Sequence, residues 1–149
     1  MLWTSVIEIS KSALEHNFHF IKSRLGENVQ FSSVVKGNAY GHGIEVFVPL
    51  AENCGISHFS VFSADEALRV QKATLTNPTI LIMGMLDNNQ LEWAIKNGIE
   101  FFVFDLDRLK QAALTAKRIG IPAKVHIEVE TGMNRTGFSK KEISEVMLL

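Results

Sequence analysis

Two kinds of hydrophobic pattern alternate along this chain, and each predicts one kind of secondary structure. Short apolar runs rich in β-branched and aromatic residues predict strands, over residues 6–10, 31–36, 58–63, 79–84, 100–105 and 123–130. Longer stretches with apolar residues three or four positions apart predict helices, over residues 12–25, 44–54, 63–74, 88–98, 105–120 and 139–149. The first of these helices has an apolar face made by Leu14, Phe18, Ile21 and Leu25. Strand and helix therefore alternate over almost the whole chain.

Polar residues and glycines mark the predicted helix boundaries. Three pairs fit the Ser-x-x-Glu capping box that begins many helices, namely Ser12 with Glu15, Ser63 with Glu66 and Ser139 with Glu142. Asp105 and Asp107, which flank the end of a predicted strand, are placed to cap the helix that follows it. Glycines that can adopt the left-handed conformation predict helix ends, at Gly26, Gly55, Gly98 and Gly120.

The predicted strands point to a parallel sheet. The runs at 79–84 and 101–104 are apolar almost throughout rather than alternating, which is typical of parallel strands buried on both faces. Strand ends recur near residues 36, 63, 84, 105 and 130, and successive βα units of this size predict a (β/α) barrel or a doubly wound sheet. A complete barrel takes about 250 residues. We therefore expect an α/β fold that forms part of a (β/α)8 TIM-type barrel, about five of its eight units, with two open sheet edges.

Composition excludes several classes of protein. The chain has 149 residues, 46% of them apolar and 21% charged, which is typical of one globular domain. Its net charge of −1 gives no basic surface for nucleic acid, and no apolar run approaches the roughly 20 residues that span a bilayer. The first ten residues lack the basic region of a secretion signal, and the single cysteine, Cys54, cannot form an internal disulfide. We expect a soluble cytoplasmic protein without nucleic-acid or membrane partners, and no His or Cys motif predicts a metal site.

The stretch FSSVVKGNAYGHG, residues 31–43, carries the clearest candidate chemistry. Lys36 is predicted to end the first strand of the parallel set, where βα folds place their active sites. At such a position of low dielectric the neutral amine of a lysine can add to an aldehyde. The glycines that follow permit unusual dihedrals, and Tyr40 offers a hydroxyl group. The alternative is a lysine that reaches solvent above a glycine-rich loop, and these residues alone leave both interpretations open.

Two segments resemble motifs of the alanine racemase family. VVKGNAYGHG, residues 34–43, is similar to the pyridoxal-phosphate lysine motif VVKANAYGHG, and HIEVETGMNRTGF, residues 126–138, resembles the family segment H-x-x-V-D-T-G-M-G-R-x-G-F. The opening VIEISKSALEHNF, residues 6–18, also fits the N-terminal segment of the family. The resemblance implies that residues 1–149 are the N-terminal part of the pyridoxal-phosphate-binding barrel domain, with the remaining barrel and a C-terminal β-domain absent.

The resemblance also implies an activity and its residues. Lys36 would hold pyridoxal 5'-phosphate as an imine and act as one of two bases that interconvert L- and D-alanine, which supplies D-alanine for peptidoglycan. Tyr40 would donate its hydroxyl group to the cofactor phosphate, and Arg135 would bind the phenolic oxygen of the cofactor and the substrate carboxylate. In the family the second base is a tyrosine of the C-terminal domain, contributed by the partner subunit of a homodimer. We therefore expect little or no activity from this chain alone.

Three departures from the family pattern bear on the site. Gly37 replaces an alanine, and Asn134 replaces the second glycine of G-M-G-R, where asparagine tolerates a left-handed backbone better than most residues. Glu128 stands where many members have a carbamylated lysine. We expect the Glu128 carboxylate to replace the carbamate and to orient Arg135 directly or through water. The alternative is an outward-facing strand residue without a role in the site.

Three functions are compatible with these residues. The first is an alanine racemase of which this chain is the N-terminal barrel region. The second is a related pyridoxal-phosphate enzyme with the same barrel, either a racemase of another amino acid or a decarboxylase. The third is a non-catalytic partial barrel that binds the cofactor or a partner chain.

Overall fold

Five parallel strands lie side by side in the order in which they occur along the sequence. In the computed structural model, which describes residues 4–148, the strands are β1 (Ser33–Val34), β2 (His58–Val61), β3 (Thr79–Ile82), β4 (Glu100–Val103) and β5 (Val125–Ile127). Every strand pairs in parallel with its sequence neighbour, in the order β1-β2-β3-β4-β5. This order is that of a barrel wall, because a doubly wound sheet reverses its strand order at a switch point. The predicted partial (β/α)8 barrel of about five units is confirmed.

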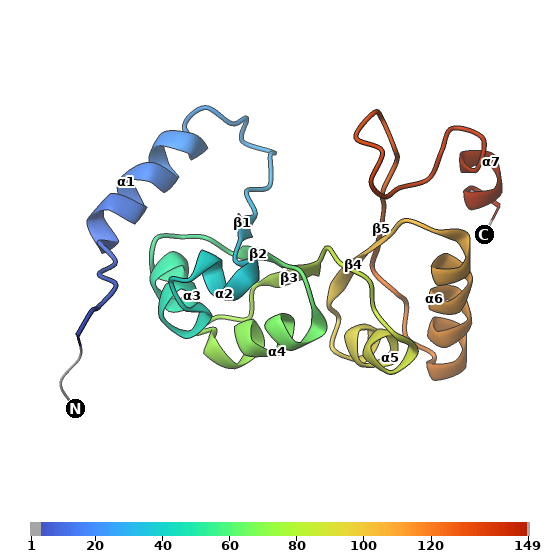
Figure 1. Cartoon of the computed structure of the whole chain (residues 1–149), viewed down its shortest axis with the longest axis horizontal. Coiled ribbons are helices and arrows are strands. Elements are labelled where there is room, and N and C mark those ends of the chain that lie inside the picture. The colour runs from blue at the N-terminus through green and yellow to red at the C-terminus, as the bar shows by residue number, and fades with distance from the viewer. Residues whose placement is uncertain (1–3, 149) are drawn as a thin grey trace.

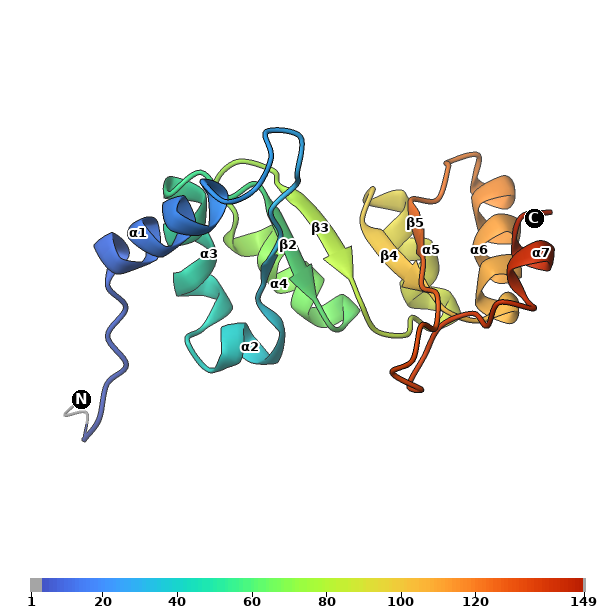
Figure 2. The same ribbon diagram turned by 90° about the horizontal axis from the view of Figure 1, so that it is seen from above.

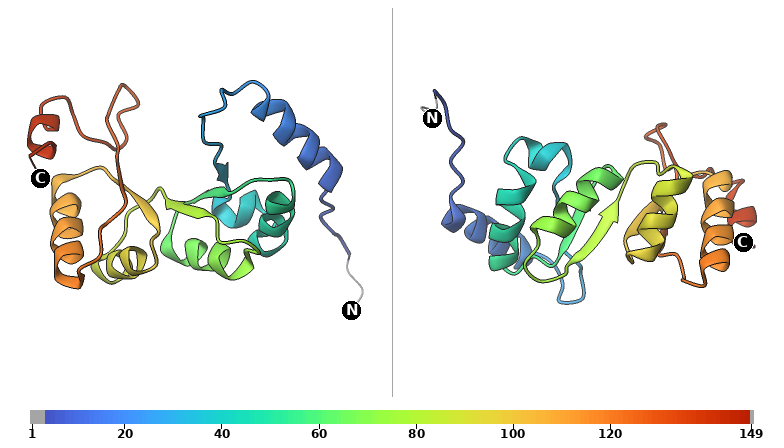
Figure 3. Two further views of the ribbon diagram at one scale, coloured as in Figure 1. Left: turned by 180° about the vertical axis from the view of Figure 1, so that it is seen from behind. Right: turned by 90° about the horizontal axis from the view of Figure 1, so that it is seen from below.

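Helices cover one face of this sheet. The helices that connect successive strands are α3 (Ile44–Asn53), α4 (Ala64–Ala73), α5 (Asn88–Lys96) and α6 (Leu106–Ile119). Figure 1 shows α3, α4 and α5 below the strands and α6 beside β5, with α1 (Lys11–Lys22) and α7 (Ile143–Val146) towards the two sides of the molecule. Seen from above, β2 and β3 lie with α3 and α4, and β4 and β5 lie with α5 and α6 (Figure 2). The views from behind and below show that α1 and α7, the first and the last helix, lie on opposite sides of the sheet (Figure 3).

The hydrophobic core lies between the sheet and these helices. Alternate strand residues, such as Phe59 in β2 and Phe101 in β4, point toward the helices and are fully buried. The residues between them face the opposite side of the sheet. The sequence predicts that this second face is also buried. Leu81 is buried there, with 7% of its surface exposed, whereas Val34 is 39% exposed. The side that faces the interior of a complete barrel is therefore only partly covered by the described residues.

The strand predicted over residues 6–10 is wrong. These residues have no regular structure, and Val6 and Ile7 are 70% and 67% exposed. Within residues 4–148 no strand lies beside this segment, and an isolated strand cannot satisfy its own backbone hydrogen bonds. The segment instead ends in a helix cap, because the Ser10 hydroxyl accepts a hydrogen bond from the amide of Ala13 at 3.2 Å.

The predicted helix caps are confirmed only in part. Ser10 rather than Ser12 begins α1, so the predicted pair of Ser12 with Glu15 is wrong. Asp105 caps α6 as predicted and accepts from the amide of Arg108 at 2.8 Å. Local spacing indicates that a cap is possible, but the path of the preceding chain decides which residue becomes the first of the helix.

The last helix is shorter than predicted, and residue 149 of its predicted range lies outside the described residues. The helix predicted over 139–149 is the short α7, preceded by a turn in which Glu142 accepts hydrogen bonds from the amide and hydroxyl of Ser139.

No helix within residues 4–148 has the length and apolar character needed to cross a membrane.

Candidate functional site

The carboxyl ends of all five strands open on one cavity of about 350 Å³. The cavity is lined by residues that follow each strand and by residues of a loop after β5. They include Lys36, Phe62, Met83, Phe104, Glu128 and Arg135. The carboxyl ends of parallel strands share one edge of a sheet, and this edge carries the active sites of βα barrels. Lys36, Glu128 and Arg135, three of the residues predicted for the site, are therefore brought together.

Lys36 reaches this edge from a shorter strand than the sequence predicts. The ladder ends at Val35, whose amide donates to the Ser60 carbonyl at 2.8 Å, and Lys36 begins the short element α2 (Lys36–Tyr40). The prediction that Lys36 itself ends the strand is wrong, but its side chain is partly buried in the cavity wall as expected of a residue at this position.

The chain after Lys36 forms a left-handed turn. Gly37, Asn38, Ala39 and Tyr40 have φ values of 61°, 56°, 54° and 53°, and Gly41 follows at 91°. The buried Ala39 fixes the turn to the strand, because its amide donates to the Val35 carbonyl at 2.8 Å. The turn places Tyr40 with Lys36 beside a second cavity of about 430 Å³, which adjoins the first because Lys36 and Phe62 line both.

A folded-back loop carries Arg135 to the cavity. The chain leaves β5, turns, and returns so that the Phe138 amide donates to the Glu128 carbonyl at 2.8 Å, with Phe138 fully buried beneath. The Glu130 carboxylate lies inside the loop, and the backbone amides of Asn134 and Gly132 hold its pKa below the ordinary value. Asn134 has a φ of 53° and so adopts the left-handed conformation that the family glycine suggests.

Glu128 faces the cavity rather than the helices. Its carboxylate accepts a hydrogen bond from the Thr136 hydroxyl at 2.9 Å, and Thr136 is the neighbour of Arg135 in the loop. The Glu128 carboxylate therefore contacts the loop that carries the guanidinium, through Thr136 rather than through Arg135 itself.

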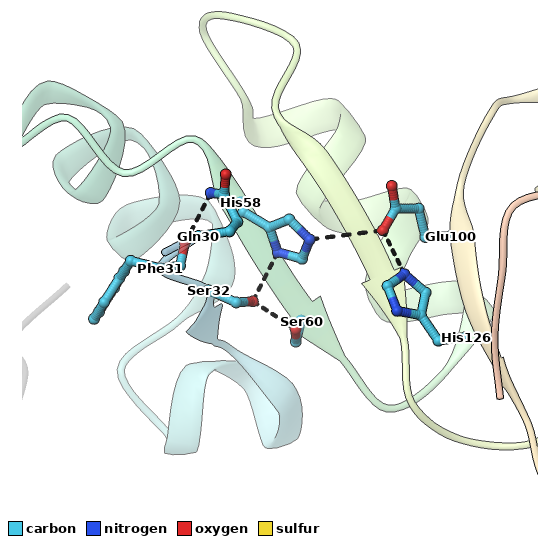
Figure 4. Close-up of polar contacts among 7 residues, drawn as sticks. All are labelled: Gln30, Phe31, Ser32, His58, Ser60, Glu100 and His126. Carbon is cyan, nitrogen blue, oxygen red and sulfur yellow. Dashed lines mark hydrogen bonds and ion pairs between the residues drawn. The ribbon is translucent and has the colours of Figure 1, made fainter. Parts of the chain in front are cut away.

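A polar cluster lies at the other end of the strands (Figure 4). His58 Nδ1 lies 2.7 Å from the Ser32 hydroxyl, and the Glu100 carboxylate lies 2.7 Å from His126 Nε2 and 3.7 Å from His58 Nε2. Burial lowers the pKa of His58, although the neighbouring Glu100 carboxylate opposes this shift. Within residues 4–148 no three such side chains are arranged to hold a metal ion. The cluster satisfies buried polar groups on the inner face of the sheet.

Several residues that shape the site were not singled out from the sequence. Asn38 and Arg69 contact each other beside the left-handed turn, and Glu130 organises the Arg135 loop. Glu66 was predicted to be a helix cap, but its carboxylate accepts from the amides of Phe62 and Asn38. Glu130 lies in the family-like segment 126–138, but that pattern does not indicate that its carboxylate accepts hydrogen bonds from the amides of the loop.

The described residues thus form a parallel barrel wall with a lysine after its first strand and an arginine loop after its fifth. The sequence profile described as "Alanine racemase, N-terminal domain" matches residues 9–149, and the chain belongs to this family. Alanine racemase 2 of Caldanaerobacter subterraneus subsp. tengcongensis is 36% identical over 140 residues, which cover 93% of this chain and 36% of that protein. The chain thus spans little more than a third of the length of this curated relative.

Solved structures give the same result. Alanine racemase of Clostridium difficile 630 superposes with a TM-score of 0.83 at 29% identity, over 92% of this chain and 36% of that one. A histidine racemase from Leuconostoc mesenteroides superposes with a TM-score of 0.79 at 28% identity, over 93% of this chain and 38% of that one. The fold is therefore shared by racemases whose names give different substrates.

The residues around the two cavities fit pyridoxal phosphate. The volumes lie in the range of about 300–1,000 Å³ that is common for small-molecule sites, and the first cavity has aromatic and methionine walls for a flat ring. The side chains also suit the groups of the cofactor. The Lys36 amine can bond to its aldehyde. The Tyr40 phenol and the Arg135 guanidinium can donate hydrogen bonds to its anionic oxygens.

Proposed function

We propose that this chain supplies the lysine-bearing part of a pyridoxal-phosphate-dependent alanine racemase. The observation that carries the proposal is that Lys36 and Arg135, 99 positions apart in the sequence, line one cavity at the carboxyl edge of the barrel wall. Residues 1–149 would be the N-terminal part of the barrel domain. The whole protein would act in the cytoplasm as a homodimer and supply D-alanine for peptidoglycan.

Each predicted residue would have a defined role in this reaction. Pyridoxal phosphate, when bound, accepts the electron pair that is left when an amino acid loses its α-proton. Lys36 would hold the cofactor through its amine and, once the substrate amine had replaced it there, would move that proton at its freed nitrogen. Tyr40 would donate its hydroxyl group to the phosphate. Arg135 would bind the substrate carboxylate through its planar guanidinium, and Glu128 would fix the loop that carries Arg135 by accepting from Thr136.

Borohydride trapping tests this proposal directly. The purified chain is incubated with pyridoxal phosphate, reduced and digested, and the labelled peptide is identified by mass. We expect one label on Lys36, lost in Lys36→Arg and retained in Lys72→Arg, which alters an exposed lysine of α4 outside both cavities. Labels scattered over exposed lysines, or no label, would contradict the proposed role of Lys36.

A racemase of another amino acid is the second candidate, and the similarity to a histidine racemase favours it. Substrate preference separates the two. The chain with pyridoxal phosphate is incubated with L-alanine and with L-histidine, before and after borohydride reduction, and the D-isomer is measured by chiral chromatography. D-alanine formation that disappears after trapping supports the first candidate, and D-histidine formation supports the second. A cofactor label on Lys36 without any D-isomer indicates a chain that binds the cofactor but does not turn over by itself.

A further inference from the structure

The left-handed turn after Lys36 needs support from outside its own sequence. A left-handed backbone brings the Cβ atom of an L-residue close to the following carbonyl oxygen, and such residues normally occur singly. Here Asn38, Ala39 and Tyr40 adopt it in succession, at φ values of 53–56°. Strained backbone of this kind persists only when surrounding groups hold it, and it is concentrated at functional sites.

Asn38 is the residue through which the turn is held. Its amide donates to the Glu66 carboxylate at 3.2 Å. Its side-chain oxygen accepts from the guanidinium of Arg69 at 2.6 Å and from the amide of Ile44 at 3.1 Å. Two helices, α3 and α4, therefore fix the backbone and the side chain of the same residue.

The groups that hold Asn38 are themselves fixed. Arg69 forms two further hydrogen bonds of 2.7 Å to the two carboxylate oxygens of Glu45, which lower the pKa of Glu45 to about 2. The second oxygen of Glu66 accepts from the Phe62 amide at 3.0 Å, and Phe62 lines both cavities. Glu66 and Arg69 are three positions apart on α4, so they project from the same face of the helix.

Tyr40 depends on this arrangement more than its neighbours do. Its side chain is 65% exposed, so packing does not fix it and its position follows the backbone of the turn. Asn38 lies midway in sequence between Lys36 and Tyr40. Contacts that hold Asn38 therefore also hold the backbone from which the side chains of Lys36 and Tyr40 extend.

We propose that Glu66 and Arg69 are positioning residues that hold the left-handed turn and so keep Lys36 and Tyr40 in register for the cofactor. The consequence for the cofactor rests on the proposed function, whereas the effect on the turn does not. Neither residue is assigned to the bond with the cofactor or to proton transfer.

Arg69→Met tests this inference because methionine keeps the length of the side chain and removes the guanidinium. Arg118→Met is the matched control, since Arg118 also donates to a carboxylate at 2.7 Å, that of Glu92 on α5, but lies far from the turn in sequence. The first measurement is hydrogen–deuterium exchange of the amides of Ala39 and Gly43, without cofactor. We expect exchange about tenfold faster in Arg69→Met, the effect of losing a hydrogen bond to a charged group, and no change in Arg118→Met.

The second measurement is a titration with pyridoxal phosphate, followed by its absorption when bound to Lys36. We expect Arg69→Met to raise the dissociation constant about tenfold and Arg118→Met to leave it unchanged. Glu66→Gln, which keeps an acceptor oxygen, should bind the cofactor more tightly than Glu66→Ala at equal resistance to urea. A purely structural role would weaken both Glu66 variants in proportion to their loss of stability.

The outcomes are distinguishable. A native chain that fails to bond pyridoxal phosphate at Lys36 counts against the proposed function, while the exchange measurement still decides whether Arg69 holds the turn. Equal exchange in Arg69→Met and Arg118→Met would overturn the inference. Faster exchange in Arg69→Met with unchanged cofactor binding would also overturn it. Arg69 would then stabilise the turn, but that stabilisation would have no effect on cofactor binding.

Discussion

Gly137 closes the loop that carries Arg135, and replacing it with alanine should destabilise the chain through two separable effects. Its φ of 112° is a backbone conformation that L-residues rarely adopt. A Cβ atom would also lie 2.8 Å from the Glu130 amide nitrogen and 3.0 Å from the Val129 carbonyl carbon, so the backbone of this segment must shift by a few tenths of an ångström. Because these neighbours are backbone atoms, no side chain can rotate away. The two effects together should cost about 2–4 kcal/mol.

Gly132→Ala provides the matched control within the same loop. Gly132 has a similar φ of 129°, but a Cβ atom there would meet nothing within 4 Å, so only the conformational cost remains. Urea unfolding at equilibrium measures both variants, with equal slopes required for the comparison. We expect Gly137→Ala to lose about 1–3 kcal/mol more than Gly132→Ala, the usual cost of overpacking. Equal losses would refute the steric part of the reasoning.

Three further predictions concern stability. Phe138→Ala should lower the free energy of unfolding by about 3–5 kcal/mol, measured in urea, because this ring is fully buried beneath the Arg135 loop. Asn134→Ala should lower it by about 1 kcal/mol and Asn134→Gly should change it by less, since φ is 53° and only glycine takes this backbone without strain. Burial holds the pKa of His58 below its ordinary value of 6.5, so the unfolded chain binds more protons and stability should fall as the pH drops through 6.5. His58→Gln should flatten this part of the pH profile, and an unchanged slope would contradict the assignment.

The sheet and its helices could be predicted from the sequence because each depends on a local pattern. Apolar runs such as 79–84 have the length of a buried strand, and the spacing of strand ends matches one βα unit. Residues 6–10 have the same pattern but form no strand. A strand requires a neighbour to pair with, and the apolar pattern of a segment says nothing about whether a neighbour is present.

The residues of the candidate site could be predicted from the sequence, but the backbone conformation that positions them could not. Lys36 and Arg135 belong to recognisable motifs, and parallel topology requires that residues after successive strands meet at one edge. The glycines of the first motif indicated an unusual backbone, but the left-handed conformation also includes Asn38 and Ala39. Asparagine tolerates this conformation, but alanine does not favour it. The turn also depends on hydrogen bonds of Asn38 to Glu66 and Arg69, which lie 28 and 31 positions further along the chain and which a local pattern does not predict.

The geometry of the first motif is therefore determined partly by residues outside it, and Gly37 illustrates the consequence. It has a φ of 61°, and a Cβ atom there would meet nothing within 4 Å, so the alanine usual in the family would fit but would add left-handed strain. Glycine removes that strain but makes the unfolded backbone more flexible, and these effects oppose each other. The departure at Gly37 should accordingly have little effect on the turn. Loss of Arg69 removes a hydrogen bond to Asn38 without any compensating effect. Replacing Arg69, which is distant from Lys36 in sequence, should therefore disturb the surroundings of Lys36 more than replacing the adjacent Gly37.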